Sequence, residues 1–223
     1  YCSGHLIEAA CTYYEATGKR KLLDIAVKNA ECIYDRFVMQ NTEGIPGHPE
    51  IELALLRLYR LTENKHFLEL AQKFINERGK APDFWAREAK KRSWSVWNSD
   101  PWGNDYRQSA KPVREQTEAV GHAVRAVYLY TGMADLAAET EDKELFAACR
   151  RLWENIVHRK MYITGGIGST VQGEAFTVDY DLPPDTAYSE TCAAIGLIFF
   201  AEKMLENEIN GEYGDVMELV FYN

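Results

Sequence analysis

Two acids and a thiol lie in one irregular stretch of the chain, between residues 165 and 196. Glu174 and Glu190 supply the carboxyl groups, and Cys192 supplies the thiol. Glycine and proline interrupt the approach to a very apolar helix. A long irregular segment inside a compact domain is uncommon unless it serves a function. We therefore interpret this stretch as one wall of an active site.

The carboxylate pair suggests cleavage of a glycosidic bond. That reaction needs a proton donor at the leaving oxygen and a second group, a nucleophile or a base, on the other side of the sugar. Among 34 acidic residues, two carboxylates alone carry little information. Glu174 could equally be a surface acid, and Glu190 could be an N-terminal helix residue favoured by the helix dipole.

Cys192 has two interpretations from the sequence. An apolar-flanked cysteine is usually buried packing, but Cys192 could also bind a metal together with Glu190. Residues two apart point to different sides of a regular helix, so joint ligation requires a non-helical first turn. Zinc takes about four ligands, and this run offers two. Spacing alone therefore does not predict a metal.

Three histidines lie in, or directly before, the predicted buried helices. His5 begins the first helix, His48 directly precedes the second, and His122 is expected about two turns into the third. If these helices run parallel around a ring, their N-terminal ends share one rim. His5, His48 and Glu190 would then converge, which predicts a polar pocket.

The apolar periodicity predicts an all-α fold made of helical hairpins. Four short polar turns each separate two apolar-periodic stretches, which is typical of an αα-hairpin. They lie at residues 17–19, 62–65, 140–143 and 210–212. The first helix of each pair is apolar on more faces than the second. This alternation suggests an inner ring of helices inside an outer one, as in an α/α toroid.

The longest insertion between the predicted helices, residues 80–111, is rich in tryptophan. Its indole side chains are those of Trp85, Trp94, Trp97 and Trp102. A platform for a flat ligand would use such rings. The alternative is that they pin a long loop onto the helices.

Composition narrows the class of protein further. The chain has 223 residues, 46% of them hydrophobic, enough to bury the core of one or two domains. The net charge of -9 argues against a nucleic-acid surface. Five widely spaced cysteines suggest a reducing compartment, so we expect a cytoplasmic protein. No apolar run is long enough to predict a membrane partner.

Several long strings of the sequence resemble the β-L-arabinofuranosidases of glycoside hydrolase family 127. They are residues 1–9, 46–55, 112–126, 163–169 with 173–176, and 187–196. The resemblance implies an (α/α)6 barrel and a retaining, zinc-dependent hydrolase with a cysteine nucleophile. It assigns Glu174 as the general acid/base and Glu190 with Cys192 as two zinc ligands. His5, His48 and His122 would line the sugar pocket.

The sequence also departs from this family pattern. The family's nucleophile and last zinc ligand are adjacent cysteines in a later motif, and no cysteine follows Cys192. We therefore expect residues 1–223 to be a partial catalytic barrel, incomplete at the C-terminus and lacking the family's β-sandwich domains. Alone, it should be inactive on its carbohydrate substrate. Assembly into a homo-oligomer is left open.

Two other functions remain open at this point. One is a sugar epimerase or isomerase on the same toroid, in which histidines such as His48 and His122 move protons. The other is a helical array that binds a glycan without chemistry. An epimerase or isomerase would not need Glu190 and Cys192, so we consider it less well supported than a hydrolase.

Overall fold

The computed structural model describes residues 1–92 and 103–223, and these residues are mostly helical. They form two compact units, Tyr1–Glu77 and Arg78–Asn223. The only strands in the described residues are two of two residues each. The expected all-α fold is therefore confirmed. In the described part of the chain, no helix is both long and apolar enough to span a bilayer.

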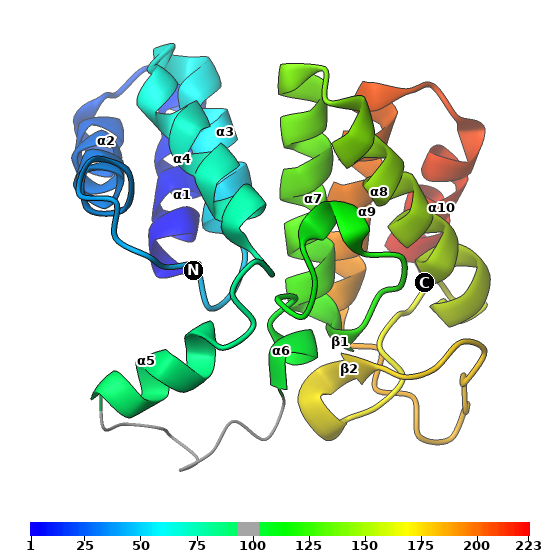
Figure 1. Ribbon diagram of the computed structural model, residues 1–223. Coiled ribbons are helices and arrows are strands. Elements are labelled where there is room, and N and C mark those ends of the chain that lie inside the picture. Colours follow the sequence, from blue (N-terminus) through cyan, green and yellow to red (C-terminus); the bar gives the residue numbers. More distant parts are fainter. Residues whose placement is uncertain (93–102) are drawn as a thin grey trace. The chain divides into compact units, whose positions relative to one another are not determined.

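The first unit consists of two helical hairpins. Its elements are α1 (Cys2–Thr17), α2 (Lys21–Tyr34), the π-helical turn η1 (Asp35–Met39), α3 (Ile51–Thr62) and α4 (Lys65–Glu77). Helix α1 packs against α2 and α3, and α3 packs against α4 (Figure 1). The N-terminal ends of α1 and α3 bring the histidines at these positions into the same region of the unit.

The second unit contains the remaining helices and one small ladder. Its elements are α5 (Phe84–Arg92), α6 (Gly103–Tyr106), η2 (Val113–Glu115), β1 (Gly121–His122), α7 (Ala123–Thr140), α8 (Lys143–Asn155), η3 (Ile156–Lys160), η4 (Gln172–Glu174), β2 (Ala175–Phe176), α9 (Thr191–Asn207) and α10 (Gly211–Tyr222). Helix α7 packs against α8 and α9, and α10 packs against α9 (Figure 1). Strands β1 and β2 are antiparallel, with Gly121 opposite Phe176 and His122 opposite Ala175.

The predicted turns between paired helices are confirmed, and in three of them the same type of hydrogen bond ends the first helix. At the end of each first helix, a threonine hydroxyl donates to the carbonyl oxygen four residues earlier: Thr17, Thr62 and Thr140 at 2.6–2.7 Å. The next residue then adopts a left-handed conformation that ends the helix. The fourth turn is closed by Asn210, whose side chain caps α10.

A close approach of α9 to α7 fixes where the irregular segments meet. A Cβ added to Gly196 would lie 2.3 Å from the Val127 side chain, so only glycine fits at this crossing. The rings of Tyr130 and Trp153 pack against Phe200, with centroids 5.7 and 5.6 Å away. This buried core supports the first turns of α7 and α9, which carry the candidate site.

One predicted helix start is wrong. We expected His122 about two turns inside a helix, but α7 begins at Ala123 and His122 belongs to β1. The reason is the preceding Gly121, whose φ of 68° is incompatible with a continuous right-handed helix. A Cβ at that position would also lie 2.1 Å from the Asp105 carbonyl oxygen. Apolar periodicity cannot detect such a break.

The tryptophan-rich insertion is described only in part. Trp94, Trp97 and Trp102 lie outside the described residues. Trp85 donates its indole N–H to the Ser109 hydroxyl at 3.0 Å, and the Arg107 guanidinium stacks over its ring at 4.9 Å. These contacts favour the loop-pinning interpretation for Trp85.

Candidate active site

Glu174 lies at the junction of a tight turn and strand β2. Gly173 and Glu174 both have left-handed backbones, with φ of 72° and 51°. A non-glycine residue in that region is uncommon and is often found at a functional position. The turn brings the Glu174 carboxylate beside His122, whose ladder partner is the next residue, Ala175.

His122 holds Glu174 through one ring nitrogen and its own helix through the other. Its Nε2 lies 2.9 Å from Glu174 Oε2, and its Nδ1 accepts the Arg125 backbone N–H at 3.1 Å. Because Nδ1 accepts a hydrogen bond, the proton of the neutral ring must lie on Nε2. His122 is therefore oriented to donate to the carboxylate.

Tyr188 engages the other oxygen of the same carboxylate. Its hydroxyl donates to Glu174 Oε1 at 2.9 Å. Hydrogen bonds from Tyr188, and then from His122, lower the pKa of Glu174 because they stabilise the charged form. The same bond to Glu174, followed by one to Glu190, raises the pKa of Tyr188. In this state the Glu174 carboxyl is ionised and its side chain is 43% exposed.

The environment of His122 keeps the imidazole neutral. Burial lowers its pKa, and the hydrogen bond to Glu174 opposes that effect only in part. The Tyr106 ring meets the imidazole edge to face at a centroid distance of 5.3 Å, and the Arg125 guanidinium lies 4.4 Å from the Tyr106 centroid. A neutral donor next to a carboxylate is compatible with repeated proton transfer at Glu174.

Glu190 completes a carboxylate pair in this unit. It has an extended backbone, φ -70° and ψ 150°, directly before α9. One ligand atom from each of His122, Glu174 and Glu190 lies within 4.8 Å of the others. Two carboxylates this close repel each other unless a donor or cation lies near them. The Tyr188 hydroxyl is one such donor.

The glycine run before Glu174 positions Tyr188 and Glu190. The Ser189 N–H donates to the Gly168 carbonyl at 2.9 Å, and the Tyr188 N–H donates to the Ser169 carbonyl at 3.3 Å. A Cβ at Gly166 would lie 2.9 Å from the Ser189 side chain. These glycines therefore allow two irregular segments to pack together.

The two residues that the resemblance assigns to zinc form an incomplete donor set. The extended backbone of Glu190 meets the requirement for a non-helical first turn. The Cys192 thiol is exposed and does not belong to either three-ligand cluster among the described residues. Since zinc takes about four ligands, Glu190 and Cys192 alone do not form a zinc site.

The other two predicted pocket histidines lie together in the first unit. The Tyr1 ring contacts both His5 and His48, at centroid distances of 4.5 Å each. His5 Nδ1 lies 3.1 Å from Glu50 Oε1, and His48 Nδ1 lies 2.6 Å from the Pro49 carbonyl oxygen. Glu190 belongs to the second unit, so its expected proximity to His5 and His48 stays a prediction.

Sequence reasoning identified the acids but missed their supports. Tyr188 is part of a string that we quoted for the resemblance, and a phenol two residues before a candidate acid was a usable signal. Lys160 and Asn155 also support this region. They contact Ala119 across 41 and 36 positions of the sequence, and no local pattern indicates these contacts.

This arrangement can move a proton at a defined oxygen. Glu174 is reachable from solvent, and two donors fix its direction. Its lowered pKa suits a base in the resting state. Donating a proton requires its pKa to rise, which desolvation by a bound ligand would achieve.

Comparison with known proteins finds one family whose model matches the chain along its whole length. The model for the β-L-arabinofuranosidase GH127 catalytic domain matches residues 1–223. A non-reducing end β-L-arabinofuranosidase of Bifidobacterium longum subsp. longum is 45% identical over 232 residues, covering 100% of this chain and 34% of that protein.

Solved structures agree with this match. The crystal structure of a GH127 β-L-arabinofuranosidase from Geobacillus stearothermophilus T6 has a TM-score of 0.94 and 52% identity, over 100% of this chain and 35% of that one. A second GH127 β-arabinofuranosidase has a TM-score of 0.86 and 44% identity, over 99% of this chain and 32% of that one. The chain thus spans about a third of the length of these relatives.

Proposed function

We propose, because this chain belongs to the GH127 β-L-arabinofuranosidase catalytic-domain family, that it contributes the acid/base side of a glycosidase that cleaves β-L-arabinofuranosyl linkages. The observation that carries the proposal is the position of Glu174. Its two carboxylate oxygens are held by His122 and Tyr188, and its side chain is still reachable from solvent.

In the proposed reaction, Glu174 first gives a proton to the leaving glycosidic oxygen. It then takes a proton from the water that releases the sugar. His122 and Tyr188 hold the carboxylate in one orientation through both steps. The sugar would bind at the solvent-exposed side of the Glu174 carboxylate.

A retaining outcome is part of this proposal. The ligand atoms of Glu174 and Glu190 lie within 4.8 Å of each other. In this proposal Glu190 is a zinc ligand and the nucleophile is a cysteine, so retention rests on the family resemblance. The attacking thiolate would lie on the opposite side of the sugar from Glu174.

Zinc remains a proposal that rests on the family resemblance. Glu190 and Cys192 would supply two donors, and the metal would hold a thiol as thiolate. Titrating zinc into the purified protein and into Glu190→Gln tests this directly. Weaker binding by the variant would support the assignment, and equal binding would contradict it.

The function itself is tested by product analysis. The whole protein should release L-arabinose from an aryl β-L-arabinofuranoside, and NMR should find the first product with the anomeric configuration of the substrate. An inverted first product would contradict the retaining mechanism. Interconversion of free sugars without hydrolysis would instead support an epimerase.

A further inference from the structure

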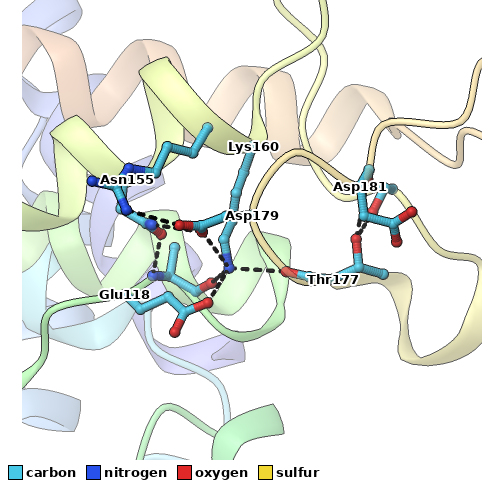
Figure 2. Close-up of polar contacts among 9 residues, drawn as sticks. Glu118, Asn155, Lys160, Thr177, Asp179 and Asp181 are labelled. Carbon is cyan, nitrogen blue, oxygen red and sulfur yellow. Dashed lines mark hydrogen bonds and ion pairs between the residues drawn. The ribbon is translucent and has the colours of Figure 1, made fainter.

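A buried lysine lies at the end of the helical turn that follows α8. The Lys160 side chain is 3% exposed. Its Nζ lies 2.7 Å from Glu118 Oε1, 2.9 Å from the Ala119 carbonyl oxygen and 2.9 Å from the Thr177 carbonyl oxygen (Figure 2). An ammonium has three N–H donors, so these acceptors use all of them. Buried lysines are rare unless they are paired in this way.

The acceptors of Lys160 belong to the two segments that carry the proposed acid/base pair. Ala119 lies three residues before His122, and Thr177 lies three residues after Glu174. Strands β1 and β2 join these segments over two residues each. So short a ladder has little stability of its own. Lys160 adds a shared donor just beyond the ladder, where Thr177 follows Phe176.

Asn155, at the end of α8, holds the same two segments from a second point. Its Oδ1 accepts the Ala119 N–H at 2.8 Å, and its Nδ2 donates to Asp179 Oδ1 at 2.9 Å. Asp179 also accepts from Arg159 at 2.9 Å and lies 3.6 Å from the Lys160 ammonium (Figure 2). Asn155 at the end of α8 and Lys160 in η3 therefore form a clamp across both segments, and Asp179, in the segment after β2, pairs with both of them.

We propose that Lys160 is a positioning residue for the acid/base: it holds the segments of His122 and Glu174 in the register that allows their 2.9 Å contact. This inference rests on the proposed function of Glu174. Lys160 is buried and holds the backbone just outside the ladder, without touching the reacting atoms. A misplacement of about 1 Å in a catalytic group can cost about 100-fold in rate.

Lys160→Met tests the clamp by removing the donors while keeping most of the side-chain volume. Lys203→Met is the matched control, because Lys203 is also largely buried and ion-paired, with Asp135 and Glu206. Lys203 lies twelve residues along α9 from Thr191, about 18 Å from the start of that helix. Hydrogen exchange is measured by mass spectrometry on peptides that cover residues 117–123 and 173–178.

We expect exchange in these two peptides to accelerate about tenfold or more in Lys160→Met and to stay at the wild-type rate in Lys203→Met. In kinetic assays of the whole protein, Lys160→Met should lower kcat about 100-fold with KM nearly unchanged. Lys160→Arg, which keeps the charge and offers several donors, should recover part of that loss. If Lys160 had only a structural role, its loss would accelerate exchange across the whole unit, and kcat would not fall selectively with KM unchanged.

Several outcomes overturn the proposal. They are unchanged exchange at the ladder in Lys160→Met, unchanged kcat, or equal effects in Lys203→Met. If Lys160→Met does not fold, Glu118→Gln tests the same clamp and should produce the same pattern with a smaller amplitude. If the wild-type protein hydrolyses no arabinofuranoside, the proposed function fails, and the exchange result still decides whether Lys160 holds the ladder.

Discussion

Glu174 in the second unit and Glu50 in the first both lie beside a histidine, yet their pKa values move in opposite directions. Glu174 Oε2 is 2.9 Å from His122, and Glu50 Oε1 is 3.1 Å from His5. The pKa of Glu174 is lowered, chiefly by hydrogen bonds, whereas burial raises that of Glu50 to about 8. A neighbouring histidine therefore does not decide the charge of a carboxyl group.

The difference lies in what surrounds each carboxylate. Glu174 accepts two hydrogen bonds and is partly exposed. Glu50 is 1% exposed, and His5 approaches it without hydrogen-bonding geometry, so neither oxygen has a hydrogen-bond partner within the described residues. The negative charges of Glu8 and Glu52 oppose its ionisation further. Hydrogen bonds keep the first glutamate charged, and desolvation keeps the second neutral.

The largest expected difference between the two acids is in catalysis. Glu174→Gln removes the group that transfers protons and should lower kcat/KM on an alkyl β-L-arabinofuranoside by about 10²–10⁴-fold. Glu50→Gln replaces a neutral acid with a neutral amide of the same shape, so kcat/KM at pH 6 should stay close to wild type. Equal losses in the two variants would remove the distinction between them.

The next effect is on stability against pH. An acid whose pKa is about 8 in the folded state and 4.5 when unfolded binds more protons in the folded state between those values. The free energy of unfolding should therefore fall as pH rises from about 4.5 to 8, by about 3–5 kcal/mol from this group. Urea unfolding at pH 5, 6.5 and 8 should show this fall for wild type and a flatter profile for Glu50→Gln. Parallel profiles would mean that Glu50 ionises normally.

A smaller effect should come from the packing that buries Glu50. A Cβ at Gly4 would lie 2.8 Å from the Glu50 Cγ and 2.9 Å from the Ile51 nitrogen. Gly4→Ala should therefore destabilise the protein by about 1–3 kcal/mol, because it overpacks α1 against the start of α3. Gly214→Ala is the control: it lies in α10 with nothing within 4 Å, and alanine there should be neutral or stabilising. Thermal unfolding of both variants measures the difference, and equal stabilities would show that α1 can shift away from Glu50.

The smallest effect concerns the hydroxyl that supports Glu174. Tyr188→Phe removes the main cause of the lowered pKa, so the pKa of Glu174 should rise towards its ordinary value. Because Glu174 must be protonated to act as the acid in the first step, the alkaline limb of the pH profile of kcat/KM should then move to higher pH. Tyr213→Phe, which removes a similar bond to Glu208, should leave that limb in place. An unmoved limb in Tyr188→Phe would show that His122 alone sets the charge of Glu174.

The helices and the candidate acids were within reach of sequence reasoning because their signals are local. A threonine that bonds back one turn, followed by a left-handed residue, ends a helix wherever it occurs, as at Thr62 and Glu63. Glu174 and Glu190 were found as acids in an irregular stretch next to glycines. The family resemblance then assigned their roles, and the family itself is confirmed.

The supports of the site were beyond such reasoning because they depend on contacts between distant residues. Lys160 reaches Ala119 across 41 positions, and His122 reaches Glu174 across 52. Periodicity also failed at His122, where the positive φ of Gly121 starts the helix later than its apolar pattern suggests. The ring into which the hairpins would close depends on how the two units are placed, and it stays a prediction.

The central claim, that Glu174 is the acid/base, is tested most directly by changing the leaving group. Wild type and Glu174→Ala should be compared on an aryl arabinofuranoside with an acidic phenol and on an alkyl arabinofuranoside with a poor leaving group. A good leaving group needs no proton, so the account predicts a small loss in the bond-breaking step for the aryl substrate and a large one for the alkyl substrate. Equal losses on both substrates would contradict it.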